Sequence, residues 1–443
     1  MKQTANLKLT LAGAALAALP AIATVPEVSD VQMSQNEASR RVKITYALTE
    51  PAVITLDVQT NATVNGGTVW ASIGGAAVGA ATGDVWKRVE AGQRTIRWQP
   101  DLAWPGHTVA DGGARAVVTA WALDNTPDYL VVDVSAGAKP NTQRYYPSAE
   151  FLPGGLLGND DYRTAKLVLR KVMAKGVTWT MGSTTLEKQR WGTNENTHEV
   201  TLTNNYYFGV FPVTQAQWAL IQTARPEPSW FNSAADRAMR PVEQVCYNEI
   251  RCAANSTVAD TSCYYPANPH AGSFLGLLRT KTGLDFDLPS EAQWEFAARA
   301  GHGDTKWGDG SGILNGDADA NLSLLGRYRH NGGQIQNGTA YADPARGCGA
   351  ANGTAIVGSY APNDWGLYDT AGNVWEQCLD WSASDITGLN GEVNTTVGTK
   401  RVRRGGCFQE AAGNSRPACR SNANPDSRTG IGGFRVVCTA GLH

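Results

Sequence analysis

The sequence lacks several motifs that define common classes of enzyme and binding protein. It contains no Cys-x-x-C, no Gly-x-Ser-x-Gly and no His-Glu-x-x-His, and none of its six histidines has a second histidine three or four residues away. These absences argue against a zinc ribbon, a thioredoxin-type site, the common serine and zinc hydrolases and a mononuclear iron site. The formal net charge is only -2, so we expect no surface built for nucleic acid or another polyanion.

Apolar stretches of membrane length are also missing after the first residues of the chain. Lys2 and Lys8 give a positive start, Leu9 to Ala23 is apolar, and Ala21-Ile22-Ala23 has the spacing of a cleavage site. This run is short and rich in small residues, which is typical of a secretory signal peptide rather than a spanning helix. We therefore expect cleavage near Ala23 and a mature protein without a membrane span that is periplasmic, secreted or displayed at the cell surface.

Cysteine is absent from the first 245 residues, and eight cysteines follow. An exported protein can form disulfides, but spacing alone does not determine which cysteines pair. The eight are Cys246, Cys252, Cys263, Cys348, Cys378, Cys407, Cys419 and Cys438.

Residues 28–135 have the pattern of half-buried antiparallel strands. Val42, Ile44, Tyr46 and Leu48 alternate with polar neighbours, and further alternating runs follow between Gly, Pro and Asn clusters. This pattern predicts an Ig-like β-sandwich with a structural or spacer role. Residues 136–165 show no period and are interpreted as a linker, packed against another part of the protein because it carries several aromatic residues.

Residues 166–443 combine short strand-like pieces, long Gly- and Asn-rich loops and two clear helix starts. Thr214 precedes one helix with Gln217 three residues on, which is the spacing of a capping box. Ser290 precedes a second helix, whose apolar face includes Trp294. We expect an α+β domain held by contacts between ordered loops rather than by a large sheet.

The motifs of this second domain resemble those of the sulfatase-modifying-factor, or formylglycine-generating-enzyme-like, family. They occur in the family's order over residues 179–435, and the stretch NDWGLYDTAGNVWE is the most specific. The resemblance implies a variant of the C-type-lectin-like fold with little regular secondary structure. The matching segments are Trp179–Ser183, His198–Leu202, Pro212–Gln215, Arg240–Glu243, Leu288–Glu295, Asn363–Glu376, Arg403–Gly406 and Gly433–Arg435.

The family includes copper-dependent oxidases that convert a sulfatase cysteine to formylglycine, and these need two thiolates to hold Cu(I). Counting from Gly406, the two positions are Glu410 and Ser415; counting back from Arg420 with a short deletion, they are Cys407 and Ala412. By either count the pair is incomplete. If the protein is nevertheless an oxidase, its substrate is a sulfatase peptide and its candidate thiols are Cys407 and Cys419, which otherwise form a disulfide or stay separate.

The family resemblance also implies structural Ca²⁺, for which carboxylate and carbonyl oxygens are suitable ligands. Carried over by position, the ligands of one site are the side chains of Asp369 and Glu376 and the carbonyls of Gly372 and Val374. A second site uses Asn321 and the carbonyl of Leu322, with later loop oxygens.

The C-terminal segment, residues 405–435, keeps the glycines and arginines of the family between small and polar residues. This pattern resembles the variable region of lectin-fold receptors that a retroelement diversifies, although ordinary drift gives similar residues. It favours a non-catalytic protein that binds a protein or glycan ligand, and the sulfatase-type oxidase is the alternative. The predicted ligand-binding residues are Cys407, Phe408, Gln409, Glu410, Cys419, Ser421, Ala423, Ser427, Thr429 and Ile431.

Overall fold

The computed structural model describes residues 25–439 except 233–234, 254–255, 257–260, 332–334, 337–338 and 341–352. The predicted signal peptide and Cys348 lie outside the described residues. Strands and ordered loops dominate, and the helices are short. Among the residues described, no helix combines the length and the apolar character needed to cross a membrane.

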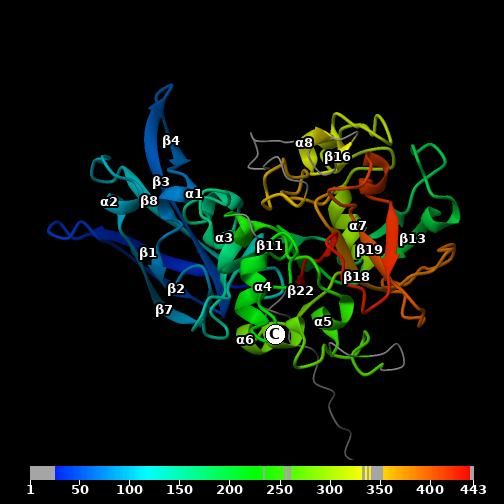
Figure 1. Ribbon diagram of the computed structural model, residues 1–443. Coiled ribbons are helices and arrows are strands. Elements are labelled where there is room, and N and C mark those ends of the chain that lie inside the picture. Colours follow the sequence, from blue (N-terminus) through cyan, green and yellow to red (C-terminus); the bar gives the residue numbers. More distant parts are fainter. Residues whose placement is uncertain are drawn as a thin grey trace, which may run out of the picture.

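Residues 28–121 form two antiparallel sheets that share one apolar core, at the left of Figure 1. The alternation of the sequence is confirmed here, because Val42, Ile44, Tyr46 and Leu48 are all buried. The first sheet has the order β1 (Val28–Gln35), β2 (Val42–Leu48), β7 (Gly92–Trp98) and β5 (Thr82–Gly83). In the second sheet β3 (Ala52–Val64) pairs with β4 (Gly67–Ser72), β6 (Arg88–Val89) and β8 (Ala114–Trp121). Short helices α1 (Gly75–Val78) and α2 (Pro100–Ala103) lie between these strands.

A six-stranded sheet joins this first part to the rest of the protein. Its order is β10 (Arg144–Tyr146), β9 (Tyr129–Asp133), β11 (Lys166–Val172), β14 (Tyr206–Gly209), β22 (Val437–Thr439) and β15 (Phe286–Asp287). Leu130 of β9 packs into the core of the second part, whereas Val131 packs against the first two sheets. Strand β9 falls within the 28–135 unit that the sequence predicts, but it pairs in this sheet and not in either of the first two sheets. Alternation in the sequence predicts a strand but does not determine which other strand it pairs with.

The segment 136–165, predicted as a packed linker, is folded onto the same sheet. It contributes β10 and helix α3 (Asp161–Thr164), and Tyr145 and Tyr146 are buried. The backbone N–H of Tyr145 also donates to the carbonyl of Trp86 in the first part, at 2.8 Å. The two parts of the chain are thus in contact over a continuous core.

The second part is built around helix α7 (Glu291–Arg299) and a four-stranded sheet, at the right of Figure 1. The predicted capping boxes at Thr214 and Ser290 are both present, at the starts of α4 (Gln215–Ile221) and α7. The sheet has the order β20 (Arg420–Ala423), β19 (Arg401–Arg404), β18 (Trp375–Trp381) and β21 (Gly432–Gly433). The other elements are α5 (Tyr247–Arg251), α6 (Phe274–Thr282), α8 (Leu322–Leu325) and the strand pairs β12 (Thr178–Met181) with β13 (His198–Thr201) and β16 (Ile335–Gln336) with β17 (Thr339–Ala340).

Candidate ligand-binding face

The C-terminal segment rests on buried ion pairs made by the family's most specific motifs. Arg435 donates to both oxygens of Glu376 at 2.6 Å, and both side chains are fully buried. Arg404 pairs with Glu291 of α7 at 3.1 Å, and Arg420 donates to the same glutamate at 2.8 Å. Because breaking a buried pair leaves an uncompensated charge, these arginines fix the position of the strands that carry the segment.

Tight backbone packing at Gly406 sets the turn into this segment. Gly406 has a φ of 75°, and a Cβ atom there would lie 2.4 Å from the hydroxyl of Ser415. Only glycine combines that backbone conformation with so close an approach. The turn thus packs the backbone at Gly406 against Asn414 and Ser415.

Neither of the first pair of copper positions offers a thiol. The Glu410 carboxylate is half-buried and accepts from the side chain of Asn414. The Ser415 hydroxyl is buried and has no hydrogen-bond partner among the described residues. By the other count, Ala412 is buried in a different apolar cluster from Cys407.

Cys407 and Cys419 lie in one small buried cluster with Trp375. Both are free thiols, so they do not form the disulfide that the sequence left open. Burial raises the pKa of Cys419 to about 12 and also raises the pKa of Cys407. Both thiols are therefore protonated at neutral pH, which disfavours attack or metal binding by either sulfur.

The disulfide of the described residues joins Cys252 and Cys263 instead, eleven residues apart in sequence. Cys246, Cys378 and Cys438 are buried free thiols. This pairing ties the end of α5 to the loop that precedes α6, and neither cysteine belongs to the C-terminal segment.

The residues proposed for the first Ca²⁺ site are occupied by other partners. The Asp369 carboxylate accepts from the backbone N–H of Gly358 at 2.8 Å and from the side chain of Asn373 at 3.2 Å. Glu376 is bound by Arg435, and its Oε2 also accepts from the indole of Trp294 at 2.6 Å. In this structure the Glu376 carboxylate is therefore engaged in an ion pair. Gly372 instead meets the backbone of Arg327, where a Cβ atom would approach the carbonyl oxygen to 2.3 Å, and Val374 is buried.

The second proposed Ca²⁺ site is organised by the buried carboxylate of Asp319. Asp319 accepts from the backbone N–H groups of Asn321 and Leu322, at 2.9 and 3.1 Å, and its other oxygen accepts from Leu314. The Leu322 carbonyl accepts from Gly326 at 3.0 Å. Among the described residues no group of three or more His, Cys, Asp or Glu is placed to hold a metal, so Ca²⁺ at both sites stays a prediction.

The ten predicted ligand-binding residues divide into two groups by exposure. Cys407, Phe408, Cys419 and Ala423 are buried, and Phe408 packs edge-to-face on Phe231 with ring centroids 5.3 Å apart. In this structure the side chains of these four residues are covered and do not reach the surface that a ligand would contact. The half-buried residues that can reach a ligand are Gln409, Glu410, Ser421, Ser427, Thr429 and Ile431.

An exposed tryptophan that the sequence analysis missed borders this group. Trp230 is 71% exposed, and its Cβ lies 3.9 Å from the position of a Cβ atom on Gly430. Glu243 holds the loop, because its carboxylate accepts from the backbone N–H groups of Trp230 and Phe231 at 3.0 Å each. The Ser229-Trp230-Phe231 run carried no signal beyond its aromatic residues, and its position depends on a contact about 200 residues away along the chain.

Contacts run without a break from Trp230 to β20. Ile431 packs on the Trp375 cluster, and the Ile431 carbonyl accepts from the Trp375 backbone at 2.8 Å. Arg403 lies over the Trp375 ring at 6.0 Å and donates to the Ser421 hydroxyl at 3.3 Å. We call the surface formed by Trp230, Gln409, Glu410, Ser421, Thr429 and Ile431 the C-terminal face. A hollow of about 330 Å³ adjoins it and is lined by Asn194, Ser382, Ala383, Ser384, Thr399, Lys400, Arg420, Ser421 and Asn422.

The fold and the buried ion pairs define a class of protein in which a rigid scaffold holds ordered loops, and here those loops carry the C-terminal face. Residues 162–440 match the model of the sulfatase-modifying factor enzyme 1-like domain, which is well over half of the chain. The protein belongs to this family.

Curated relatives of this chain include two proteins named formylglycine-generating enzyme. The one from Thermomonospora curvata is 36% identical over 161 residues, covering 34% of this chain and 48% of that protein. The one from Streptomyces coelicolor is 36% identical over 165 residues, covering 35% and 47%. The chain therefore spans about half the length of these relatives.

Two solved structures are similar at lower identity. Treponema denticola variable protein 1 has a TM-score of 0.45 and 23% identity, covering 62% of this chain and 96% of that one. PvdO from Pseudomonas aeruginosa has a TM-score of 0.44 and 21% identity, covering 61% and 94%.

Proposed function

We propose that this protein is an exported, non-catalytic member of its family that binds a protein or glycan ligand through the C-terminal face. The observation that carries the proposal is the exposed Trp230 beside Gly430, next to half-buried polar side chains. Tryptophan is enriched among residues that dominate binding energy, especially where polar groups surround it. A structural tryptophan would instead be covered.

The rigidity of the surface supports the same proposal. Arg435, Arg404 and Arg420 anchor the strands below the face through buried carboxylates. A surface that is already ordered loses little conformational entropy when a ligand binds. Side chains at 409–410, 421 and 427–431 can therefore differ between related chains without changing the scaffold, which is the property that a diversified receptor needs.

We infer three further properties of this protein: a spacer role for its first part, export and structural Ca²⁺. The two N-terminal sheets act as an Ig-like β-sandwich spacer that presents the second domain, and residues 1–23 direct export. Structural Ca²⁺ stiffens the loops around Asp369 and Asn321. If the last proposal holds, Ca²⁺ raises the thermal unfolding midpoint and EDTA lowers it.

The second candidate function is oxidation of a sulfatase cysteine. Cys407 and Cys419 share one buried cluster, and two curated relatives are named formylglycine-generating enzymes. Burial and the raised pKa of Cys419 weigh against this candidate.

Titration of the reduced protein with Cu(I) separates the two functions. We expect no tight stoichiometric binding and no formylglycine in a cysteine-containing sulfatase peptide under oxygen. Tight 1:1 binding that disappears in both Cys407→Ser and Cys419→Ser, together with formylglycine formation, would establish the oxidase and refute the binding proposal.

The binding surface is tested by screening the intact protein against glycan and peptide arrays. We expect Trp230→Ala to weaken any specific signal by roughly 30-fold or more, since hot-spot truncations cost about 2 kcal/mol or more. Leu102→Ala is the matched control, because Leu102 is 77% exposed but belongs to the first part of the chain. Equal loss in both variants, or no loss in Trp230→Ala, would contradict the assignment of this face.

A further inference from the structure

A second cavity lies in the first part of the chain, remote in sequence from every family motif. It has a volume of about 530 Å³ and opens between the edge strands β1 and β8. Strands β2, β3 and β7 provide its floor, and the segment from α2 to residue 112 forms one wall. The volume falls within the range of roughly 300–1,000 Å³ typical of small-molecule pockets.

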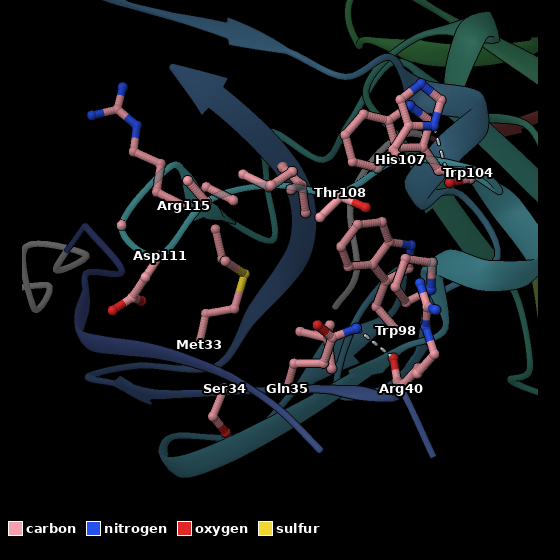
Figure 2. A pocket seen from close by; sticks show the side chains of 18 of the residues that line it. Met33, Ser34, Gln35, Arg40, Trp98, Trp104, His107, Thr108, Asp111 and Arg115 are labelled. Atoms are coloured by element: carbon pink, nitrogen blue, oxygen red, sulfur yellow. Dashed lines mark hydrogen bonds between the residues drawn. The ribbon is translucent and has the colours of Figure 1, made fainter. Parts of the chain in front are cut away.

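The floor of this cavity is apolar. Val42, Val58 and Trp98 face it although each is at least nine-tenths buried in the core. The indole N–H of Trp98 donates to the carbonyl of Ala77 at 2.7 Å, so the ring presents only carbon surface to the cavity. Met33 adds a flexible thioether above the floor, as Figure 2 shows. A fully hydrated sugar or ion would find few hydrogen-bond partners at this depth.

One wall is aromatic and held in place by its own contacts. The rings of Trp104 and His107 stack with centroids 4.0 Å apart and an angle of 8° between the planes. The Nδ1 atom of His107 lies 2.9 Å from the carbonyl oxygen of Pro105 and 3.2 Å from that of Trp104. Because a carbonyl can only accept, Nδ1 carries the proton and donates to these oxygens. The wall therefore exists before any ligand arrives.

The charges around the mouth are balanced, and the arginines have partners. Arg40 pairs with Asp101 at 3.1 Å. Arg115 donates to the side-chain oxygen of Gln59 at 2.9 and 2.7 Å and lies 4.5 Å from the centre of the Trp70 ring. Asp111 is the second acidic residue of the lining. Two arginines against two aspartates give no net preference for an ion of either sign.

Polar groups gather at the mouth rather than at the floor. Thr108 and Gln35 line the opening, and Figure 2 shows them on either side of the space that Met33, Trp98 and Trp104 border. The side-chain amide of Gln35 donates to the carbonyl of Arg40 at 2.9 Å, which leaves its oxygen as an acceptor. A ligand that reaches the floor with an apolar body can thus keep its polar groups at the rim.

We propose that this cavity is a binding site for an uncharged small molecule with a flat apolar ring system and polar groups at one edge. The aromatic and aliphatic floor takes the ring system, the rim takes the polar groups, and the balanced charges exclude ions. The site is separate from the C-terminal face and does not depend on the function proposed for that face.

Fluorescence titration of the intact protein with N-phenyl-1-naphthylamine, an uncharged two-ring probe excited directly, tests this site. We expect saturable 1:1 binding. Trp104→Ala should weaken the affinity by about tenfold, since it removes much of one aromatic wall. Ala110→Trp should abolish binding by filling the mouth, because Ala110 is an exposed residue of the lining. Leu102→Ala, exposed nearby but outside the lining, should bind like the original protein.

The anionic probe 1-anilinonaphthalene-8-sulfonate has a similar ring system and tests the charge preference. We expect it to bind about tenfold more weakly or worse, because no lining arginine is left without a partner. Non-saturable binding of the neutral probe, or unchanged affinity in Ala110→Trp, overturns the site. Equal affinity for the two probes overturns its assignment to uncharged ligands. Circular dichroism identifies a variant that fails to fold, and Ala110→Trp then decides without Trp104→Ala.

Discussion

At the scale of single residues, buried charges determine most of what is specific to this protein. One guanidinium, Arg416, is shared between the carboxylates of Glu187 and Glu195, and the three side chains are fully buried. Arg416 donates to both oxygens of Glu195 at 2.9 Å. One cation cannot neutralise two buried carboxylates, so one carboxyl holds its proton to a higher pH.

This arrangement predicts a pH-dependent stability. Burial, together with a hydrogen bond to Asp304, raises the pKa of Glu187 to about 7. The folded protein therefore binds more protons than the unfolded chain between about pH 4.5 and 7, and the contribution of Glu187 to stability falls as the pH rises through that window. We expect a loss of about 3 kcal/mol over the window, and Glu187→Gln should remove it. Urea unfolding between pH 4.5 and 8 measures the change.

The exposed Glu199 of β13 is the matched control for that measurement. Glu199→Gln should leave the pH dependence of unfolding as it is in the original protein. A Glu187→Gln profile parallel to that of the original protein would show that another group carries the proton.

At the scale of secondary-structure elements, the helices of the second part are short and depend on their first turns. The hydroxyl of Ser290 accepts from the backbone N–H of Gln293 at 3.0 Å, and the Gln293 side chain accepts from the backbone of Ser290 at the same distance. Helix α7 then presents Trp294 to the core and Glu291 and Glu295 to the arginines of β19 and β20. A shift of α7 would disturb the strands that carry the C-terminal face.

The cap of α7 gives the second prediction. Ser290→Ala should lower the free energy of unfolding by about 1 kcal/mol, since it leaves the first-turn N–H groups without their acceptor. Ser290→Gly should lower the free energy of unfolding by only about 0.3 kcal/mol, because glycine is tolerated at the N-cap position. Chemical denaturation of the three proteins gives the order. Equal stability of all three would mean that packing alone fixes the start of α7.

At the scale of the whole molecule, the two parts of the chain share a core and are not independent domains. Tyr129, Val131 and Val168 of the six-stranded sheet, with Val210 directly after β14, share one apolar cluster with the first two sheets. In Figure 1, β11 lies between the N-terminal strands and the region of α7 and β18. A common core of this kind couples the unfolding of its two halves.

Truncation tests that coupling. A chain beginning at residue 125 keeps β9 but loses the sheets that cover Tyr129 and Val131. We expect calorimetry to give one unfolding transition for the complete protein. The truncated chain should either aggregate, which size-exclusion chromatography detects, or unfold at a lower temperature in the calorimeter. A chain beginning at residue 136 also loses β9 and exposes the edge of β11, so it should aggregate more strongly. A soluble 125–443 chain with an unchanged midpoint would refute the coupling.

The sequence determined the features that depend on a few neighbouring residues. The caps at Thr214 and Ser290, the buried alternation from Val42 to Leu48 and the family motifs could all be predicted because each is a local pattern. The side chains at the two copper positions counted from Gly406 can also be read from the sequence, since Glu410 and Ser415 contain no sulfur whatever their environment.

The tertiary structure alone decided which of those residues face solvent and which distant segments meet. It buried Phe408 against Phe231, placed Trp230 beside Gly430, assigned β9 to the six-stranded sheet and formed a cavity with Trp104 in its wall. These contacts join segments tens to hundreds of residues apart, and their geometry follows from how whole elements pack. A local pattern fixes how a segment folds, but exposure and partners depend on the rest of the core, which no local pattern contains.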